Sequence, residues 1–237
     1  MTVPPRSPDV RLWTGVAAVA VAALLLAEFT VRTAIGARPE LDDPRALAEF
    51  VDRTSTQTLV IILIDTVLMA SLIVFLAGFR QIITHARRDL QWIADLAYGA
   101  GLVFVAVTLV GDAMEAGSAL DTVDMAPDAS AIRALTEGHI LMFGATGCVL
   151  LALVSAASGY VTILSRALPQ WTGWLAVGVA AANVAWLPSI FGGTSDAGFF
   201  SAGGVGVALF ATFPWLAWVI AVGFVTIRSR RSAPNGP

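Results

Sequence analysis

The chain lacks lysine entirely and has only one cysteine and two histidines among its 237 residues. Without a lysine amine, retinal and pyridoxal Schiff-base chemistry is excluded, because both cofactors attach through that amine. The single cysteine, Cys148, excludes an intrachain disulfide and a thiolate metal cluster. Cys148 lies in an apolar run, and we interpret it as a small buried hydrophobic residue.

Charge of either sign is also scarce, since charged residues make up 13% of the chain and hydrophobic residues 57%. A water-soluble domain does not have this composition. About 20 consecutive apolar residues can span a bilayer as a helix, and the sequence contains six such stretches. They are Leu12–Val31, Thr58–Gly78, Ile93–Glu115, Leu135–Ile163, Trp171–Ile190 and Gly204–Ile227. The predicted fold class is therefore an all-α, polytopic transmembrane bundle with six spans.

Six spans place both chain ends on one side of the membrane, and the arginines indicate which side. Nine of the 14 arginines fall on the side of the ends: Arg6, Arg11, Arg80, Arg87, Arg88, Arg166, Arg228, Arg230 and Arg231. By the positive-inside rule that side is cytoplasmic. The opposite connections are acidic or glycine-rich, although the first also carries Arg32, Arg38, Arg45 and Arg53. We expect a multi-pass protein of the cell membrane, the inner membrane in a bacterium.

The predicted domain organisation has three parts. Residues 1–11 form a cytoplasmic segment, residues 12–227 the transmembrane domain, and residues 228–237 a basic, disordered tail. A cleaved signal peptide ending near Ala37 is the alternative for the N-terminus, but the polar interruption at Glu28 and Arg32 favours a retained anchor. The segment Asp43–Thr54 is predicted to be an amphipathic helix on the membrane surface.

Six titratable residues interrupt the apolar stretches, and they are the strongest functional signal in the sequence: Glu28, Asp65, Asp112, Glu115, Glu137 and His139. A charged side chain is costly inside a bilayer, so such residues face a bundle interior or a water-filled cavity. At about 1.5 Å of helix rise per residue, all six lie in the outer half of their spans. We therefore predict an outward-opening polar cavity walled by the first four spans, to which Asn183 could add an amide.

These residues differ in how far their surroundings can neutralise them. Glu28 has Arg32 four positions later and Glu137 has Arg133 four positions earlier, so each glutamate can form an ion pair on its own helix. Asp65 has no basic residue within two turns. It is therefore expected either to be held neutral by a proton or to meet a partner from another helix.

Asp112 and Glu115 are three residues apart and so share one helix face, where two carboxylates can share a proton or bind a cation. The alternative is that Glu115 simply lies in the headgroup region. His139 is two positions from Glu137, so the two point to opposite sides of their helix. His139 with these carboxylates would suffice in number for a metal, but one histidine without a recognisable ligand spacing leads us to predict no metal and no cofactor.

Aromatic residues gather in the last two spans, among them Trp186 and Trp215, together with Pro188 and Pro214. Prolines kink helices, and the aromatic side chains could line an entrance whose ring faces hold a cationic or carbocationic group. An interfacial aromatic belt is the simpler interpretation. The tripeptide Trp-Thr-Gly at 13–15 and at 171–173 is interpreted in the same way, as an interfacial anchor rather than a repeat.

The order of several segments resembles a widespread bacterial family of six-span integral membrane proteins of unknown function. The resemblance rests on the first Trp-Thr-Gly, on the run from Ala27 to Arg32, on the helical outer segment, on the span with Asp65, and on residues 168–175, Leu-Pro-Gln-Trp-Thr-Gly-Trp-Leu. It covers roughly residues 11–190. It implies the fold and the topology and adds nothing on mechanism.

Three functions are compatible with this sequence. The first is an intramembrane acid–base enzyme, an isomerase or cyclase for a terpenoid-like lipophilic substrate, with Asp65, Asp112, Glu115 and His139 as catalytic residues. Its substrate-binding residues would be Glu28, Glu137, Asn183, Trp186 and Trp215. The second is a proton- or cation-coupled transporter or channel, and the third is a membrane sensor or assembly protein. The expected partners are the bilayer and a lipophilic small molecule, with a homodimer as an option and no nucleic acid.

Overall fold

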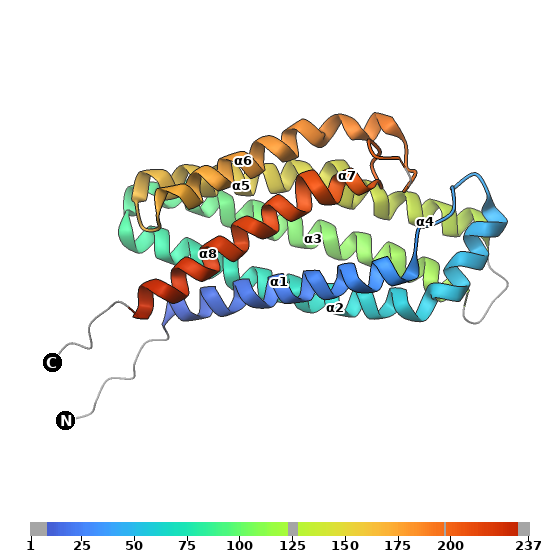
Figure 1. The fold of residues 1–237 in the computed structure, drawn as a ribbon, viewed down its shortest axis with the longest axis horizontal. Coiled ribbons are helices and arrows are strands. Elements are labelled where there is room, and N and C mark those ends of the chain that lie inside the picture. Colours follow the sequence, from blue (N-terminus) through green and yellow to red (C-terminus); the bar gives the residue numbers. More distant parts are fainter. Residues whose placement is uncertain (1–8, 123–127, 197, 232–237) are drawn as a thin grey trace, which may run out of the picture.

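The chain forms an all-α bundle in a computed structural model that describes residues 9–122, 128–196 and 198–231, with no strand among them. Six helical passages are long and apolar enough to cross a membrane. Each coincides with one of the stretches expected from the sequence to within a residue or extends beyond it, so the predicted fold class and the number of spans are confirmed. The helices run side by side, and α1 begins at the same end of the bundle where α8 finishes (Figure 1).

Three of the six passages are single α-helices: α1 (Val10–Ile35), α2 (Pro44–Ala86) and α3 (Gln91–Asp121), the last preceded by a 3-10 turn at Arg88–Leu90. The other three change helix type along their length. The fourth comprises α4 (Ala129–Leu141), a π-helical segment (Met142–Thr146) and α5 (Gly147–Ser165). The fifth is α6 (Gln170–Trp186) with a 3-10 turn (Leu187–Gly192). The sixth is α7 (Val205–Val207), a π-helical segment (Ala208–Thr212) and α8 (Phe213–Arg231).

Aspartates begin three of these helices. The side chains of Asp9, Asp43 and Asp128 accept hydrogen bonds from the backbone amides of Leu12, Ala46 and Ser130, at 3.2, 3.0 and 2.9 Å. Each carboxylate thereby satisfies an amide that has no partner inside its helix. The Ser130 hydroxyl and amide hold the pKa of the exposed Asp128 carboxyl below its usual value.

An aromatic core fills the half of the bundle near the chain ends. Phe75 and Phe79 of α2 and Trp218 of α8 are at most 2% exposed. The Trp218 ring meets the two phenyl rings edge-on, with centroids 5.7 and 5.8 Å apart. Edge-to-face packing is a favoured aromatic arrangement, and here it joins α2 to α8 in this half of the bundle.

Two predicted segments differ from the structure. Residues 43–54 were expected to form a separate surface helix, but from Pro44 onward they are the first turns of α2, which stand at an angle to the rest of the helix in Figure 1. The reason is that Leu47 and Val51 are buried against Ile132 and Ile140 of α4 rather than against lipid. The tail was expected to be disordered from Arg228, yet α8 continues to Arg231.

Some sequence predictions fall on residues outside the described ranges. They concern residues 1–8 of the cytoplasmic segment, residues 232–237 of the tail, and the acidic connection around Asp124.

The shared location of the chain ends makes a testable prediction about membrane orientation. A reporter fused after Pro237 is expected to be cytoplasmic, because the arginine-rich connections lie at that end. A reporter inserted beside Asp128, at the other end of the bundle, is expected to be external. Paired alkaline phosphatase and fluorescent protein fusions measure this. Two fusions that report the same side would contradict the topology.

Candidate functional site

Five of the six titratable residues that interrupt the spans come together between α1, α2, α3 and α4. They are Glu28, Asp65, Asp112, Glu115 and His139, and all are at most 8% exposed except Glu115, whose side chain is 18% exposed. Glu28 lies 18 residues into α1, roughly 27 Å from the start of that helix. The cluster therefore lies in the half of the bundle opposite the aromatic core, as the sequence predicted.

Arg32 is the basic centre of this cluster. Its Nε donates to Glu28 Oε1 at 2.7 Å, which confirms the predicted pair within α1. Its Nη1 and Nη2 donate to the two carboxylate oxygens of Glu115 on α3, at 3.3 and 3.2 Å. One guanidinium thus bridges two helices through a bidentate contact. Sequence reasoning treated Arg32 only as the neighbour of Glu28 and missed this second contact.

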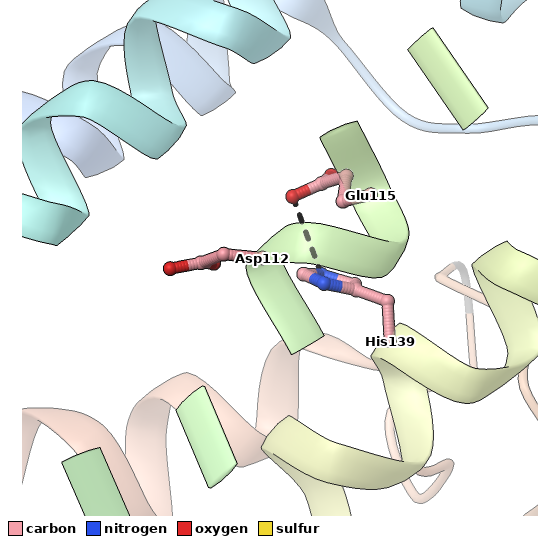
Figure 2. A group of neighbouring side chains, drawn as sticks. All are labelled: Asp112, Glu115 and His139. Atoms are coloured by element: carbon pink, nitrogen blue, oxygen red, sulfur yellow. Dashed lines mark ion pairs between the residues drawn. The ribbon is translucent and has the colours of Figure 1, made fainter. Parts of the chain in front are cut away.

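His139 is oriented by a backbone carbonyl of α3. Its Nδ1 lies 3.1 Å from the oxygen of Gly111, and because a carbonyl only accepts, Nδ1 carries the hydrogen. The other ring nitrogen, Nε2, faces Oε2 of Glu115 at 3.5 Å (Figure 2). His139 therefore faces the carboxylates, and Nε2 is the ring nitrogen directed toward them.

Asp65 of α2 and Asp112 of α3 form a buried carboxyl pair. Each residue is 2% exposed, and the two carboxyl groups are within hydrogen-bonding reach of each other. Asp65 Oδ2 and both oxygens of Asp112 receive no hydrogen bond from a donor in the described part of the chain. Two adjacent carboxylates in an apolar interior repel each other, so such a pair shares a proton or binds a cation. Asp65 was expected from the sequence to carry a proton or to meet a partner from another helix, and the residue that it meets is a second acid, Asp112.

Two adjoining cavities meet at the cluster. A polar cavity of about 450 Å³ is lined by Glu115 and His139 together with hydroxyl side chains of Thr54, Thr58, Ser118 and Thr136. An apolar cavity of about 290 Å³ is lined by Glu28, Asp65 and His139 together with a larger number of hydrophobic side chains. The hydrophobic set includes Leu25, Leu68, Met69, Phe104, Phe143, Leu151 and Trp215.

The boundary between the cavities is made of charged pairs and of the last helical passage. Arg32, Arg38, His139 and Asp196 line both cavities, and Arg38 Nη2 lies 2.5 Å from Asp196 Oδ1. Gly203, Gly204 and Ala208 also line both. The predicted cavity had walls from the first four spans only, whereas residues before and within the sixth passage form one wall. Arg38 and Asp196 lie in the connecting segments, which had no periodic pattern to reveal their place.

Three of the predicted binding residues lie outside both cavities, as far as the described residues define them. Glu137 pairs with Arg133 at 2.9 Å, as expected, and its side chain is 40% exposed on the far side of α4 from His139. Asn183 is fully buried and donates to the Val179 carbonyl of its own helix at 3.0 Å. Trp186 stacks on Phe210, with ring centroids 5.0 Å apart. Only Trp215 of the predicted tryptophans lines the apolar cavity.

The cluster includes donor atoms suited to a metal ion. One donor atom each from Asp112, Glu115 and His139 lies within 4.8 Å of the other two. Figure 2 shows Glu115 of α3 and His139 of α4 pointing toward one another, with Asp112 one turn away on α3 and its carboxyl group directed to the side. The site is therefore a buried carboxylate–histidine centre at the meeting point of a polar and an apolar cavity.

The fold and site define a multi-pass helical membrane protein with a buried acidic centre. No family model, no curated protein and no solved structure matches the chain. The resemblance to a bacterial six-span family stays a prediction, and the functional argument rests on the residues of the site.

Proposed function

We propose that the protein is an intramembrane enzyme that isomerises or cyclises a lipophilic, terpenoid-like substrate by acid–base chemistry. The observation that carries this proposal is the position of two carboxyl groups, Asp65 and Glu28, in the wall of the apolar cavity. Pockets that bind small molecules have volumes of about 300 Å³ or more. The volume of this cavity, about 290 Å³, is close to that lower limit.

Aromatic side chains supply the other part of the argument. Phe104, Phe143 and Trp215 line the same cavity as the two carboxyl groups. Protonation of a carbon–carbon double bond creates a positive charge on carbon, and ring faces attract cations without reacting with them. Together with the nearby carboxylates, these rings would stabilise a carbocation more than the neutral substrate, which is the requirement for catalysis.

The chemistry assigns different roles to the two carboxyl groups. Asp65 donates its proton to one carbon of the double bond, whose electron pair forms the new C–H bond and leaves a cation at the neighbouring carbon. The Glu28 carboxylate then accepts a proton from an adjacent carbon, and the C–H electron pair becomes the shifted double bond. Carbocations release such protons readily, so Glu28 can serve as the base although Arg32 binds it at 2.7 Å.

Proton return completes the cycle. After one turnover Glu28 carries the proton and Asp65 is ionised, so a proton must move back between them. The polar cavity adjoins both groups through Arg32 and His139, and its hydroxyl-lined wall suits water molecules that relay protons. In a cyclisation, the cation is instead attacked by a second double bond before Glu28 removes the final proton.

Proton- or cation-coupled transport is the alternative, and the excess of carboxylates over arginines in the cluster favours it. The packed aromatic core weighs against it. A transport path must cross the whole bundle, and Phe75, Phe79 and Trp218 pack together, each at most 2% exposed, in the half near the chain ends. A six-span protein would need a large rearrangement or a second copy to open that half.

A thermal-shift screen with purified protein tests the proposal. A matching isoprenoid, sterol or fatty acyl compound at about 100 times its dissociation constant is expected to stabilise the fold by ~2.7 kcal/mol. Leu151→Trp should abolish the shift, because Leu151 is 7% exposed and lines the apolar cavity. Leu153→Trp is the matched control, since Leu153 on the same helix is 40% exposed on the outer surface.

A screen without any lipophilic stabiliser would contradict the enzyme proposal, provided that the protein folds in the detergent used. Sealed liposomes then test the alternative. Ion or proton flux that Asp65→Asn removes would assign the cluster to transport instead.

A further inference from the structure

The ion pairs of the cluster leave negative charge without a partner. Four carboxyl groups belong to the cluster, those of Glu28, Asp65, Asp112 and Glu115, and the guanidinium of Arg32 pairs with two of them, Glu28 and Glu115. The next cation, Arg38, is already paired with Asp196 at 2.5 Å. A proton shared by Asp65 and Asp112 removes one charge, and a proton on His139, 3.5 Å from Glu115, would offset another. With the positive charge of Arg32, one carboxylate charge is still left without a partner. Uncompensated charge of this size is costly in an apolar interior.

The unbalanced charge coincides with a set of converging donor atoms. Asp112 is 2% exposed, and neither of its oxygens receives a hydrogen bond from the described residues. One donor from each of the three residues, which Figure 2 draws, lies within 4.8 Å of the other two.

The distance between the Glu115 and His139 donors fits a metal centre as well as an ion pair. Two ligands that bind a tetrahedral zinc ion at about 2.0–2.1 Å are roughly 3.3 Å apart. His139 Nε2 and Glu115 Oε2 are 3.5 Å apart. The contacts from Arg32 to Glu115 are 3.2 and 3.3 Å, and each carboxylate oxygen retains a second lone pair for a metal.

The His139 ring is oriented as in a metal-binding histidine, through its Nδ1. Histidines that bind metals commonly donate their other N–H to a carbonyl or carboxylate, which orients the ring and selects the tautomer. Here Nδ1 donates to the carbonyl of Gly111 at 3.1 Å. Gly111 directly precedes Asp112, so the same turn of α3 supplies both the orienting carbonyl and a carboxylate donor.

We propose that Asp112, Glu115 and His139 bind a divalent transition-metal cation. Imidazole and carboxylate ligands suit Zn²⁺ and its first-row neighbours, whereas Mg²⁺ and Ca²⁺ prefer oxygen ligands alone. Two positive charges together with one proton on the Asp65–Asp112 pair neutralise the cluster. Three protein ligands leave a coordination position for water, and Glu115 and His139 line the polar cavity that would supply it.

This inference does not depend on the proposed enzyme reaction, and the two can fail separately. A metal on Asp112 leaves Asp65 as the carboxyl group that carries the proton in the apolar cavity, so the two proposals are compatible.

Zn²⁺ binding by the purified, full-length protein tests the site directly. After treatment with a chelator and dialysis against Zn²⁺, the wild type is expected to retain about one zinc per chain by mass spectrometry of the metal. Asp112→Asn and His139→Gln keep the shape of each side chain and should weaken Zn²⁺ binding by more than the roughly 10- to 100-fold seen when an outer-shell partner is lost. His85→Gln and Asp89→Asn are the controls, because both residues are exposed at the opposite end of the bundle.

A spectroscopic measurement on the wild type avoids any dependence on how well the variants fold. Co²⁺ in a four-coordinate site with one imidazole should give visible absorption bands that added Zn²⁺ abolishes. Wild-type protein without retained zinc and without these bands would overturn the proposal. Equal zinc retention by the wild type, Asp112→Asn and His139→Gln would overturn it too, and so would loss of zinc in His85→Gln alone.

Discussion

Replacement of Asp65 by asparagine is expected to lower substrate turnover by about 10²- to 10⁴-fold, the usual contribution of a positioned general acid. The amide has the shape and neutrality of the protonated carboxyl group but cannot transfer a proton to carbon. The fold should persist, because the substitution adds neither charge nor bulk to the buried site. Conversion of the stabilising ligand in detergent, followed by mass spectrometry, measures the loss.

Asp95→Asn is the control for this substitution. Asp95 lies near the start of α3, at the end of the bundle where the chain ends lie, and pairs there with Arg80. It is far from the cavity. It should retain full turnover. Infrared difference spectra add an independent readout, since a protonated carboxyl band of the wild type should disappear in Asp65→Asn. If Asp65→Asn turns over substrate like the wild type, Asp65 is not the acid.

Replacement of Arg32 by methionine is expected to destabilise the fold by about 3 kcal/mol. Methionine keeps most of the length and the apolar contacts of the arginine stem. It leaves Glu28 and Glu115 buried without their cation, and loss of one partner from a buried ion pair costs about 3–5 kcal/mol. We expect the lower end of this range because the Arg32 side chain is 32% exposed, so that water screens part of the charge. Denaturant-induced unfolding in mild detergent measures the difference.

Arg45→Met is the matched control. Arg45 forms the same kind of pair with Glu49, four residues later, but the two side chains are 91% and 70% exposed. Exposed pairs of this spacing contribute about 0.3–0.5 kcal/mol. Equal destabilisation by the two substitutions would contradict the central role of Arg32. A greater loss of stability on Arg32→Met when Glu28 and Glu115 are present than when they are replaced would agree with it.

Asp112 has a distinctive position between the two proposals. Its carboxyl group meets Asp65, which lines the apolar cavity, and it also belongs to the donor set with Glu115 and His139. A cation bound by this donor set would therefore act on the acid at Asp65 through the carboxylate of Asp112. The acid–base and metal roles are thus assigned to different residues that share a single contact.

The amino-acid sequence by itself determined the spans and the height of the polar residues within them. Apolar runs of this length have one stable state in a bilayer, because a helix satisfies every backbone group internally. The rise per residue then places Glu28, Asp65, Asp112 and His139 in the same half of the bundle. Pairs within one helix, such as Glu137 with Arg133, also followed from spacing alone, since residues four apart are neighbours on any α-helix.

Only the tertiary structure decided which side chains meet. Helix rotation and contacts between helices depend on packing, so the sequence did not show that Arg32 bridges to Glu115 or that Asp65 meets Asp112. It also did not show that Leu47 and Val51 dock on α4, or that Trp186 and Asn183 lie apart from the cavities. The spacing of residues along a helix is set by local backbone geometry, whereas the partner of a buried charge is set by neighbouring helices that are distant in sequence.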